Sequence, residues 1–171
     1  EIDLALYDRV VFVIQDGGGG CSYVGKINVV FNGTEYSHSI AWVGATLFDQ
    51  PSSWGSQPFP WNNLDFLLAH ELGHSLGVWH ANGWDCGEVT LHDTQCRHHE
   101  YGNYFDTMGT VSRSLHFNAF YKQLLGWLSP SSVLKITQPG RYRLSSLEST
   151  SGKRSAYIER IGPDGTPYKL L

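Results

Sequence analysis

The chain has 171 residues and carries little charge and no long hydrophobic run. Only 16% of its residues are charged, with 12 Lys+Arg against 16 Asp+Glu, which leaves a formal net charge of −4. This balance provides neither a basic face for nucleic acid nor a polybasic patch for a membrane surface, so we expect no nucleic-acid partner. The most apolar stretch, residues 10–14, has the length of a strand, and the sequence therefore predicts no membrane span.

Cysteine is scarce too, with three in the whole chain. That number is too small for a disulfide scaffold and fits one bridge with one remaining thiol. Cys86 and Cys96 lie close together in one irregular stretch, which predicts a disulfide between them and leaves Cys21 free or paired with a segment outside this chain. Few basic residues with many glycines and aromatic residues favour a secreted protein, and a hydrophobic fraction of 41% favours a folded one.

Alternating elements predict a mixed α/β fold of the α+β kind with a twisted mixed sheet. Residues 9–15 are nearly all apolar and β-branched, which is typical of a buried central strand. Residues 23–31 and 36–43 are expected to be two further strands. Asn32-Gly33 between them predicts a hairpin turn, because both residues tolerate positive φ.

Two helices are expected after the strands. The first covers residues 61–76, with Asn62 or Asn63 as N-cap, and the second covers residues 116–125. The apolar face of the first is predicted from leucines at helical spacing: Leu64, Leu67, Leu68, Leu72 and Leu76. No regular element is expected in the long span between the helices, which favours a functional role for it. Beyond Pro130, strands are predicted at residues 142–147 and 156–161.

One short segment, HELGHSLGVWH at residues 70–80, concentrates titratable side chains. His70 and His74 are four residues apart, so both side chains leave one helix face and reach one metal ion, at about 2.0–2.1 Å each. Gly77 is expected to take positive φ and end the helix, so that His80 turns back as the third ligand. Imidazole ligands suit zinc better than calcium or magnesium. Glu71 can approach the metal from beside His70 without being a ligand.

This pattern, His70-Glu71-x-x-His74-x-x-Gly77-x-x-His80, resembles the zinc signature of the metzincin clan of metallopeptidases. The clan also carries a methionine turn under the metal, and Asp106-Thr107-Met108-Gly109 is similar to it. Within the clan the chain most resembles the gametolysin-type family, through Ala81-Asn82-Gly83, Tyr101-Gly102-Asn103 with Phe105-Asp106, and Leu125-Gly126-Trp127-Leu128. The resemblance covers residues 7–147. Thr110 departs from the astacin- and serralysin-like pattern, where a tyrosine can reach the zinc, so no tyrosine ligand is expected from this turn.

The resemblance implies a metzincin-like catalytic domain at residues 1–129, with an active-site helix, a Met-turn and a C-terminal helix. Residues 130–171 would begin a strand-rich extension. The implied activity is a zinc metalloendopeptidase with one catalytic Zn²⁺. His70, His74 and His80 would be the metal ligands, Glu71 the general base toward a zinc-activated water, and Met108 a support beneath the metal.

The resemblance also implies a secreted zymogen whose precursor carries a pro-segment. Peptide or protein substrates would lie extended along an edge strand, either residues 23–31 or residues 36–43. Residues 102–114 are expected to form the opposite wall of the binding site.

Two alternatives are kept beside the peptidase. One is a structural zinc module, closed by Cys86 or Cys96 as a fourth ligand, because structural sites have four protein ligands. The other is an inactive, peptidase-like adhesion domain, against which the intact Glu71 argues. The remaining histidines are not expected to be ligands: His92, His98 and His99 lie in a polar loop with Asp93 and Glu100, and His38 and His116 have ordinary structural positions.

Overall fold

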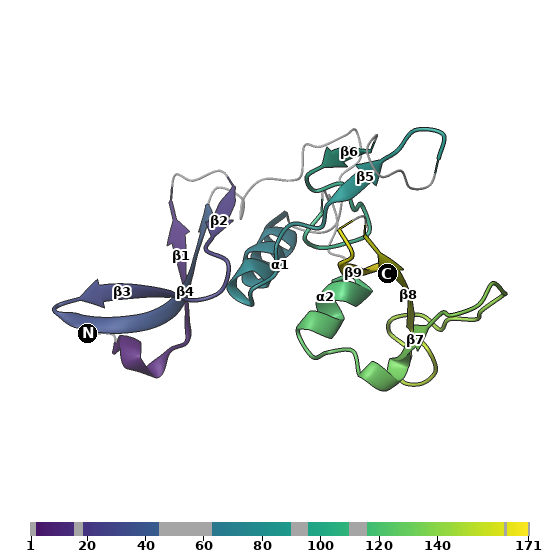
Figure 1. Cartoon of the computed structure of the whole chain (residues 1–171). Helices are drawn as coiled ribbons and strands as arrows, with labels where there is room; N and C mark the ends of the chain where they lie inside the picture. The colour runs from purple at the N-terminus through teal and green to yellow at the C-terminus, as the bar shows by residue number, and fades with distance from the viewer. Residues whose placement is uncertain are drawn as a thin grey trace. The chain divides into compact units, whose positions relative to one another are not determined.

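The computed structural model describes residues 3–15, 19–44, 63–89, 96–109, 116–162 and 164–170. Helices and strands are mixed along the chain, as an α+β protein requires (Figure 1). The chain divides into two compact units, Glu1–His116 and Phe117–Leu171. The helix α2 (Ala119–Leu124) belongs to the second unit. The predicted catalytic domain at residues 1–129 and extension at residues 130–171 stay a prediction. No helix among the described residues combines the length and the apolar character needed to cross a membrane.

The first unit is built on a four-stranded mixed sheet around the long strand β4 (Thr34–Gly44). The strand β1 (Arg9–Ile14) pairs with β4 in parallel, and β2 (Gly20–Ser22) and β3 (Ile27–Phe31) pair with it antiparallel. The predicted hairpin turn between β3 and β4 is confirmed. Its residues Asn32 and Gly33 have φ values of 49° and 78°, as a tight two-residue hairpin turn requires. A short 3-10 helix, Leu4–Leu6, precedes β1.

The strand predicted at residues 9–15 is confirmed as β1 over Arg9–Ile14, but the expectation that it is buried and central is wrong. Among the described residues β1 pairs only with β4, so it is an edge strand. The side chains of residues 11–14 are exposed on both faces of the sheet. A β-branched apolar run shows that a segment favours extended backbone, but the number of its neighbours depends on distant parts of the chain.

The predicted strand at residues 23–31 is shorter than expected, because the chain bends at residues 24–25 before β3 begins. The short strand β2, which was not predicted, precedes that bend. The predicted strand at residues 36–43 is confirmed as the central part of β4.

The first predicted helix is confirmed as α1 (Asn63–Ser75), which packs against β2 and β4. Asn62 lies outside the described residues. The expected leucine face is wrong in part, because Leu72 is 45% exposed. The buried positions next to Leu72 in this helix are instead polar residues: His70, Glu71, His74 and Ser75. Burying polar groups lowers the stability of a fold, so their burial on the packed face of α1 indicates a functional site.

The span after α1 contains more order than the sequence predicts. The strands β5 (Gly83–Asp85) and β6 (Arg97–His99) form an antiparallel pair. A disulfide between Cys86 and Cys96 lies directly beyond the paired residues, which confirms the predicted bridge. Cys21 is free and exposed.

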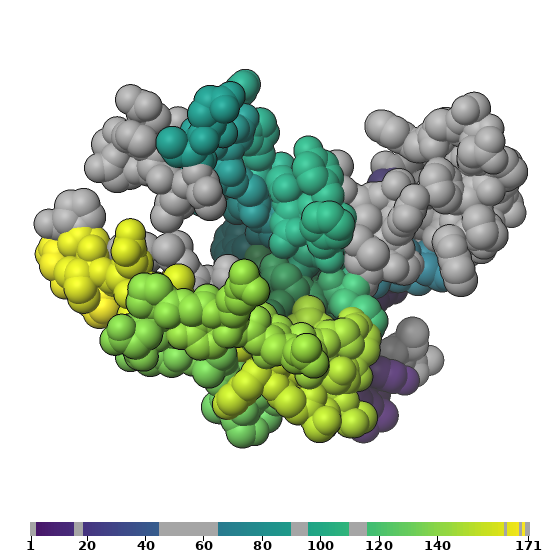
Figure 2. All heavy atoms as spheres, turned by 90° about the vertical axis from the view of Figure 1, so that its right-hand side faces the viewer, coloured from purple at the N-terminus to yellow at the C-terminus, as the bar shows by residue number. Residues whose placement is uncertain are grey.

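The second unit begins with α2, whose N-cap Asn118 accepts a hydrogen bond from the Tyr121 N–H at 2.9 Å. The 3-10 helix Pro130–Ser132 leads into a three-stranded sheet. Its middle strand β8 (Ser155–Ile161) pairs in parallel with β7 (Val133–Lys135) and antiparallel with β9 (Pro167–Leu170). In Figure 2 the atoms of this unit are coloured from green to yellow.

The strand predicted at residues 156–161 is therefore confirmed as part of β8, but the one predicted at residues 142–147 is wrong. That segment has an alternating pattern, yet it forms no strand. Both edges of β8 are already paired, with β7 and with β9, so residues 142–147 cannot form a strand beside β8. The Ser145 N–H instead donates to the Lys153 carbonyl at 2.7 Å.

Candidate metal site

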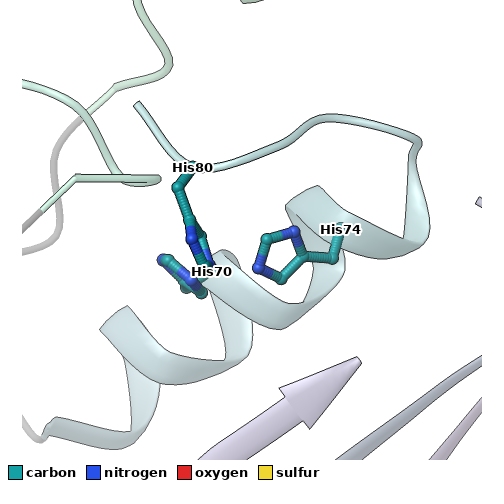
Figure 3. Close-up of side chains that lie close together, drawn as sticks. All are labelled: His70, His74 and His80. Atoms are coloured by element: carbon teal, nitrogen blue, oxygen red, sulfur yellow. The ribbon is translucent and has the colours of Figure 1, made fainter. Parts of the chain in front are cut away.

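The helix α1 presents His70 and His74 on one face, one turn apart, because four residues are close to one helical turn. The ring of His80 meets them from the segment that follows the helix (Figure 3). The potential ligand atoms of the three residues all lie within 4.8 Å of one another. The structure therefore gathers the three predicted ligands into one cluster.

The end of α1 explains how His80 reaches the other two. Gly77 has a φ of 96°, which confirms the predicted left-handed residue. Its N–H donates to the His74 carbonyl at 2.8 Å, and the Val78 N–H donates to the Gly73 carbonyl at 3.2 Å. This pair of hydrogen bonds is a Schellman motif, in which a left-handed residue ends the helix and reverses the chain.

Each of the three imidazoles is oriented through its Nδ1 atom. The Nδ1 of His70 lies 2.9 Å from the Thr107 carbonyl oxygen, and that of His74 lies 2.9 Å from the Val78 carbonyl oxygen. The Nδ1 of His80 lies 2.6 Å from the Glu100 carboxylate. Carbonyl oxygens only accept, so Nδ1 of His70 and His74 carries the hydrogen and Nε2 has the lone pair. Such hydrogen bonds are the usual partners of metal-binding histidines, so this donor set fits zinc.

Burial favours the neutral, metal-binding form of two of these rings. His70 and His74 are buried. Removal from water lowers the pKa of both below the ordinary value of 6.5, against the opposing effect of their backbone hydrogen bonds. A neutral imidazole is the form that binds a metal, so little free energy is spent on deprotonating these two rings at neutral pH.

Glu71 is buried beside the histidines. It is 4% exposed, and its Oε2 atom accepts no hydrogen bond from the described residues. Burial raises the pKa of Glu71 to about 7. A buried carboxylate with no partner destabilises a fold, and such groups occur mainly where function requires them.

Glu71 faces a hollow of about 260 Å³ in the surface of the first unit. Glycine, apolar and aromatic residues surround the carboxylate there, together with one of the three histidines. The lining residues are Gly20, Phe66, Leu67, His70, Glu71, Tyr101 and Gly109. Of the wall predicted at residues 102–114, Gly109 lines this hollow, and residues 110–115 lie outside the described part of the chain.

Met108 lies in a buried turn that is joined to the site on two sides. Its side chain has no exposed surface, and its N–H donates to the Asp106 carboxylate at 2.6 Å. Its carbonyl oxygen accepts a hydrogen bond from the Ala81 N–H at 2.7 Å, directly after His80. Because the preceding residue, Thr107, holds the His70 ring, this turn connects the first and third histidines.

Sequence reasoning did not assign a role to two residues that contact His80. The ring of Tyr101 lies on the His80 ring, with centroids 3.8 Å apart, and Tyr101 has a φ of 60°, which is rare for a residue with a side chain. Glu100 was expected to be a solvated loop residue. It is largely exposed but also binds the His80 ring. Both residues lie far along the chain from the histidine motif at residues 70–80, so no pattern in the sequence connects them with His80.

The cysteines supply no ligand to this site. Cys86 and Cys96 are bonded to each other, so neither offers the thiolate that a zinc ligand requires. Among the other histidines, His98 and His99 are exposed as expected, but they lie in the strand β6 and not in a loop. His38 is buried in β4, where a strand was expected, and His92 lies outside the described residues.

Comparison with known protein families, with curated proteins and with solved structures found no match for this chain. Any function assigned to it therefore depends on the residues and the geometry of the site.

Proposed function

We propose that this chain is a zinc-dependent endopeptidase of the metzincin type, with His70, His74 and His80 as the metal ligands. The observation that carries the proposal is the pairing of two features. Three histidines converge with Nδ1 engaged in each, and a buried carboxylate without a hydrogen-bond partner on Oε2 adjoins them in an open hollow. A metal site beside a buried carboxylate is the arrangement that metal-assisted hydrolysis needs.

Zinc, when bound, supplies Lewis-acid chemistry, which polarises a peptide carbonyl and makes water acidic enough to attack at neutral pH. The protein contributes the positions of the reacting groups. Thr107, Val78 and Glu100 keep the three imidazoles turned toward one point. Glu71 accepts the proton that the attacking water loses and passes it to the amine that leaves when the peptide C–N bond breaks.

The substrate is a peptide in extended conformation, and β2 is the strand that we propose it follows. β4 has neighbours on both sides, so residues 36–43 present no free edge. β2 pairs with β4 on one side only among the described strands, and its Gly20 lines the hollow beside Glu71. A peptide along this edge would bring its carbonyl groups close to the candidate metal site.

The structural-zinc alternative has weaker support. A closed site needs four protein ligands, and in the described part of the chain only the three histidines gather. The disulfide removes both cysteines that were considered as a fourth ligand. A structural site also gives no reason for a buried Glu71 whose Oε2 atom accepts no hydrogen bond from the described residues.

Two substitutions separate catalysis from metal binding. His74→Ala removes a ligand, so bound zinc should fall well below one per chain. Glu71→Gln keeps the size of the side chain but removes the base, so zinc should remain while casein hydrolysis falls by about 10²–10⁴-fold. Zinc content and hydrolysis are to be measured on the same preparations, with and without a chelator.

The results distinguish the zinc peptidase from the structural zinc site. Near-normal hydrolysis by Glu71→Gln would show that Glu71 is not the base. Loss of zinc from Glu71→Gln to the same extent as from His74→Ala would show that Glu71 is a ligand, which supports the structural site instead.

A further inference from the structure

Gly20 lies against the side chain of Glu71. The strand β2 packs on α1, and Gly20 is its first residue. A Cβ atom added at Gly20 would lie 2.7 Å from Glu71 Oε1, 2.9 Å from Glu71 Cγ and 2.9 Å from Leu67 Cδ1. These separations are shorter than carbon makes without displacement, so any side chain at position 20 must move Glu71, Leu67 or both.

Other closely packed glycines of the first unit differ from Gly20 in what surrounds them. A Cβ at Gly102 would meet the backbone of Gly83 and His99, and one at Gly109 would lie 1.8 Å from the Asn103 carbonyl oxygen. Backbone cannot yield without disturbing the fold, so those two glycines are required for packing. The nearest neighbours of Gly20 are side-chain atoms only, and side chains can change rotamer.

We propose that Gly20 is a positioning residue for Glu71, because the missing side chain at this position leaves the space in which the carboxylate lies. Glu71 Oε2 has no hydrogen-bond partner among the described residues, so no hydrogen bond to that atom fixes the carboxylate. The close approach of the β2 backbone at Gly20 is an observed restriction on where the carboxylate can lie. A methyl group at position 20 would push the carboxylate away from that strand while leaving the three histidines untouched.

The catalytic consequence rests on the proposed function, whereas the packing relation between Gly20 and Glu71 does not. Gly20→Ala should lower kcat by about 10²-fold, since displacement of a catalytic group by about 1 Å has an effect of that size. KM should change little, and bound zinc should remain at one per chain. The matched control is Gly162→Ala, which places a Cβ 2.8 Å from the Asp164 carboxylate in the second unit and should leave kcat unchanged.

A second readout requires no activity. The thermal midpoint of unfolding is to be measured for Gly20→Ala and for Gly162→Ala, each with Glu71 present and in a Glu71→Ala background. Gly20→Ala should lower the midpoint when Glu71 is present and by clearly less when Glu71 is Ala, because the truncated side chain no longer meets the new methyl group. Gly162→Ala should shift the midpoint equally in both backgrounds.

Equal shifts for Gly20→Ala in both backgrounds would overturn the proposal, as would full kcat in Gly20→Ala with an active parent protein. A further outcome is that the parent protein hydrolyses no peptide while the midpoint shift of Gly20→Ala still depends on Glu71. That result would uphold the positioning of Glu71 and refute the peptidase assignment. Background-dependent shifts together with a reduced kcat would support both.

Discussion

At the level of single side chains, the site combines three oriented histidines with one residue in an unusual conformation. Tyr101 holds a left-handed backbone conformation, which costs a residue with a side chain about 1–3 kcal/mol. Its N–H donates to the Asn82 side chain at 3.3 Å, and its ring covers His80. We infer that the strain is retained because the ring shields and orients the third histidine.

Tyr101 therefore provides a test of how the site is supported. Tyr101→Ala should weaken zinc affinity by about 10-fold or more, the effect of removing a group that orients a metal ligand. Tyr101→Phe keeps the ring and should bind zinc as the parent does. Competition with a chromophoric chelator measures both affinities. Equal weakening in the two variants would show that the hydroxyl group, and not the ring, is what matters.

At the level of helices and strands, the β5–β6 pair connects the third histidine to its support. Asn82 directly precedes β5, and Glu100 and Tyr101 directly follow β6. Asn82 contacts Tyr101 and Glu100 contacts His80, so one end of this small hairpin, where β5 begins and β6 ends, contributes both partners. The Cys86–Cys96 bridge closes the hairpin at the opposite end.

Removal of that bridge should loosen the hairpin. In the chain-entropy description, a loop of this size is stabilised by roughly 2–3 kcal/mol, so replacing Cys86 and Cys96 together by Ser should lower the free energy of unfolding by about that amount. Urea titration measures the difference. Cys21→Ser, which changes an exposed free thiol, is the control and should unfold as the parent does.

Alkylation without reductant gives an independent check of the same pairing. One modified cysteine per chain is expected by intact mass, and a chain carrying three modified cysteines would refute the bridge.

For the chain as a whole, the candidate metal ligands belong to one of the two units. All three candidate ligands and the residues that orient them lie in Glu1–His116. The unit Phe117–Leu171 has its own helix and three-stranded sheet, and none of its described residues belongs to a histidine, cysteine or carboxylate cluster that could hold a metal. Zinc that binds only the folded first unit stabilises that unit by mass action.

Zinc removal should therefore affect the two units unequally. At free zinc about 100 times its dissociation constant, binding contributes about 2.7 kcal/mol to the unit that binds it. Amide hydrogen exchange followed by mass spectrometry should show faster exchange in α1 and residues 97–109 after chelation, with little change in β7, β8 and β9. A uniform increase in the rate of amide exchange over the whole chain would show that the two units unfold together.

Local features of this protein are predictable from short stretches of sequence. His70 and His74 share a helix face because the helical period places them there, and Gly77 ends the helix because glycine readily adopts the required φ. The Asn32-Gly33 turn follows in the same way from the conformational preferences of its two residues. Each of these features depends on interactions within a few residues, which a linear sequence displays directly.

The remaining features arise from contacts between distant segments. The edge position of β1, the pairing of β2 and the approach of Gly20 to Glu71 depend on which strands meet around β4 and α1. Likewise Thr107 reaches His70 across 37 positions and Glu100 reaches His80 across 20. Local propensity is nearly the same for many arrangements of this kind, and the choice among them is made by the burial and hydrogen bonding of the assembled fold. For that reason the sequence predicts which histidines come together in the candidate metal site, while the groups that hold and orient them emerge only from the folded chain.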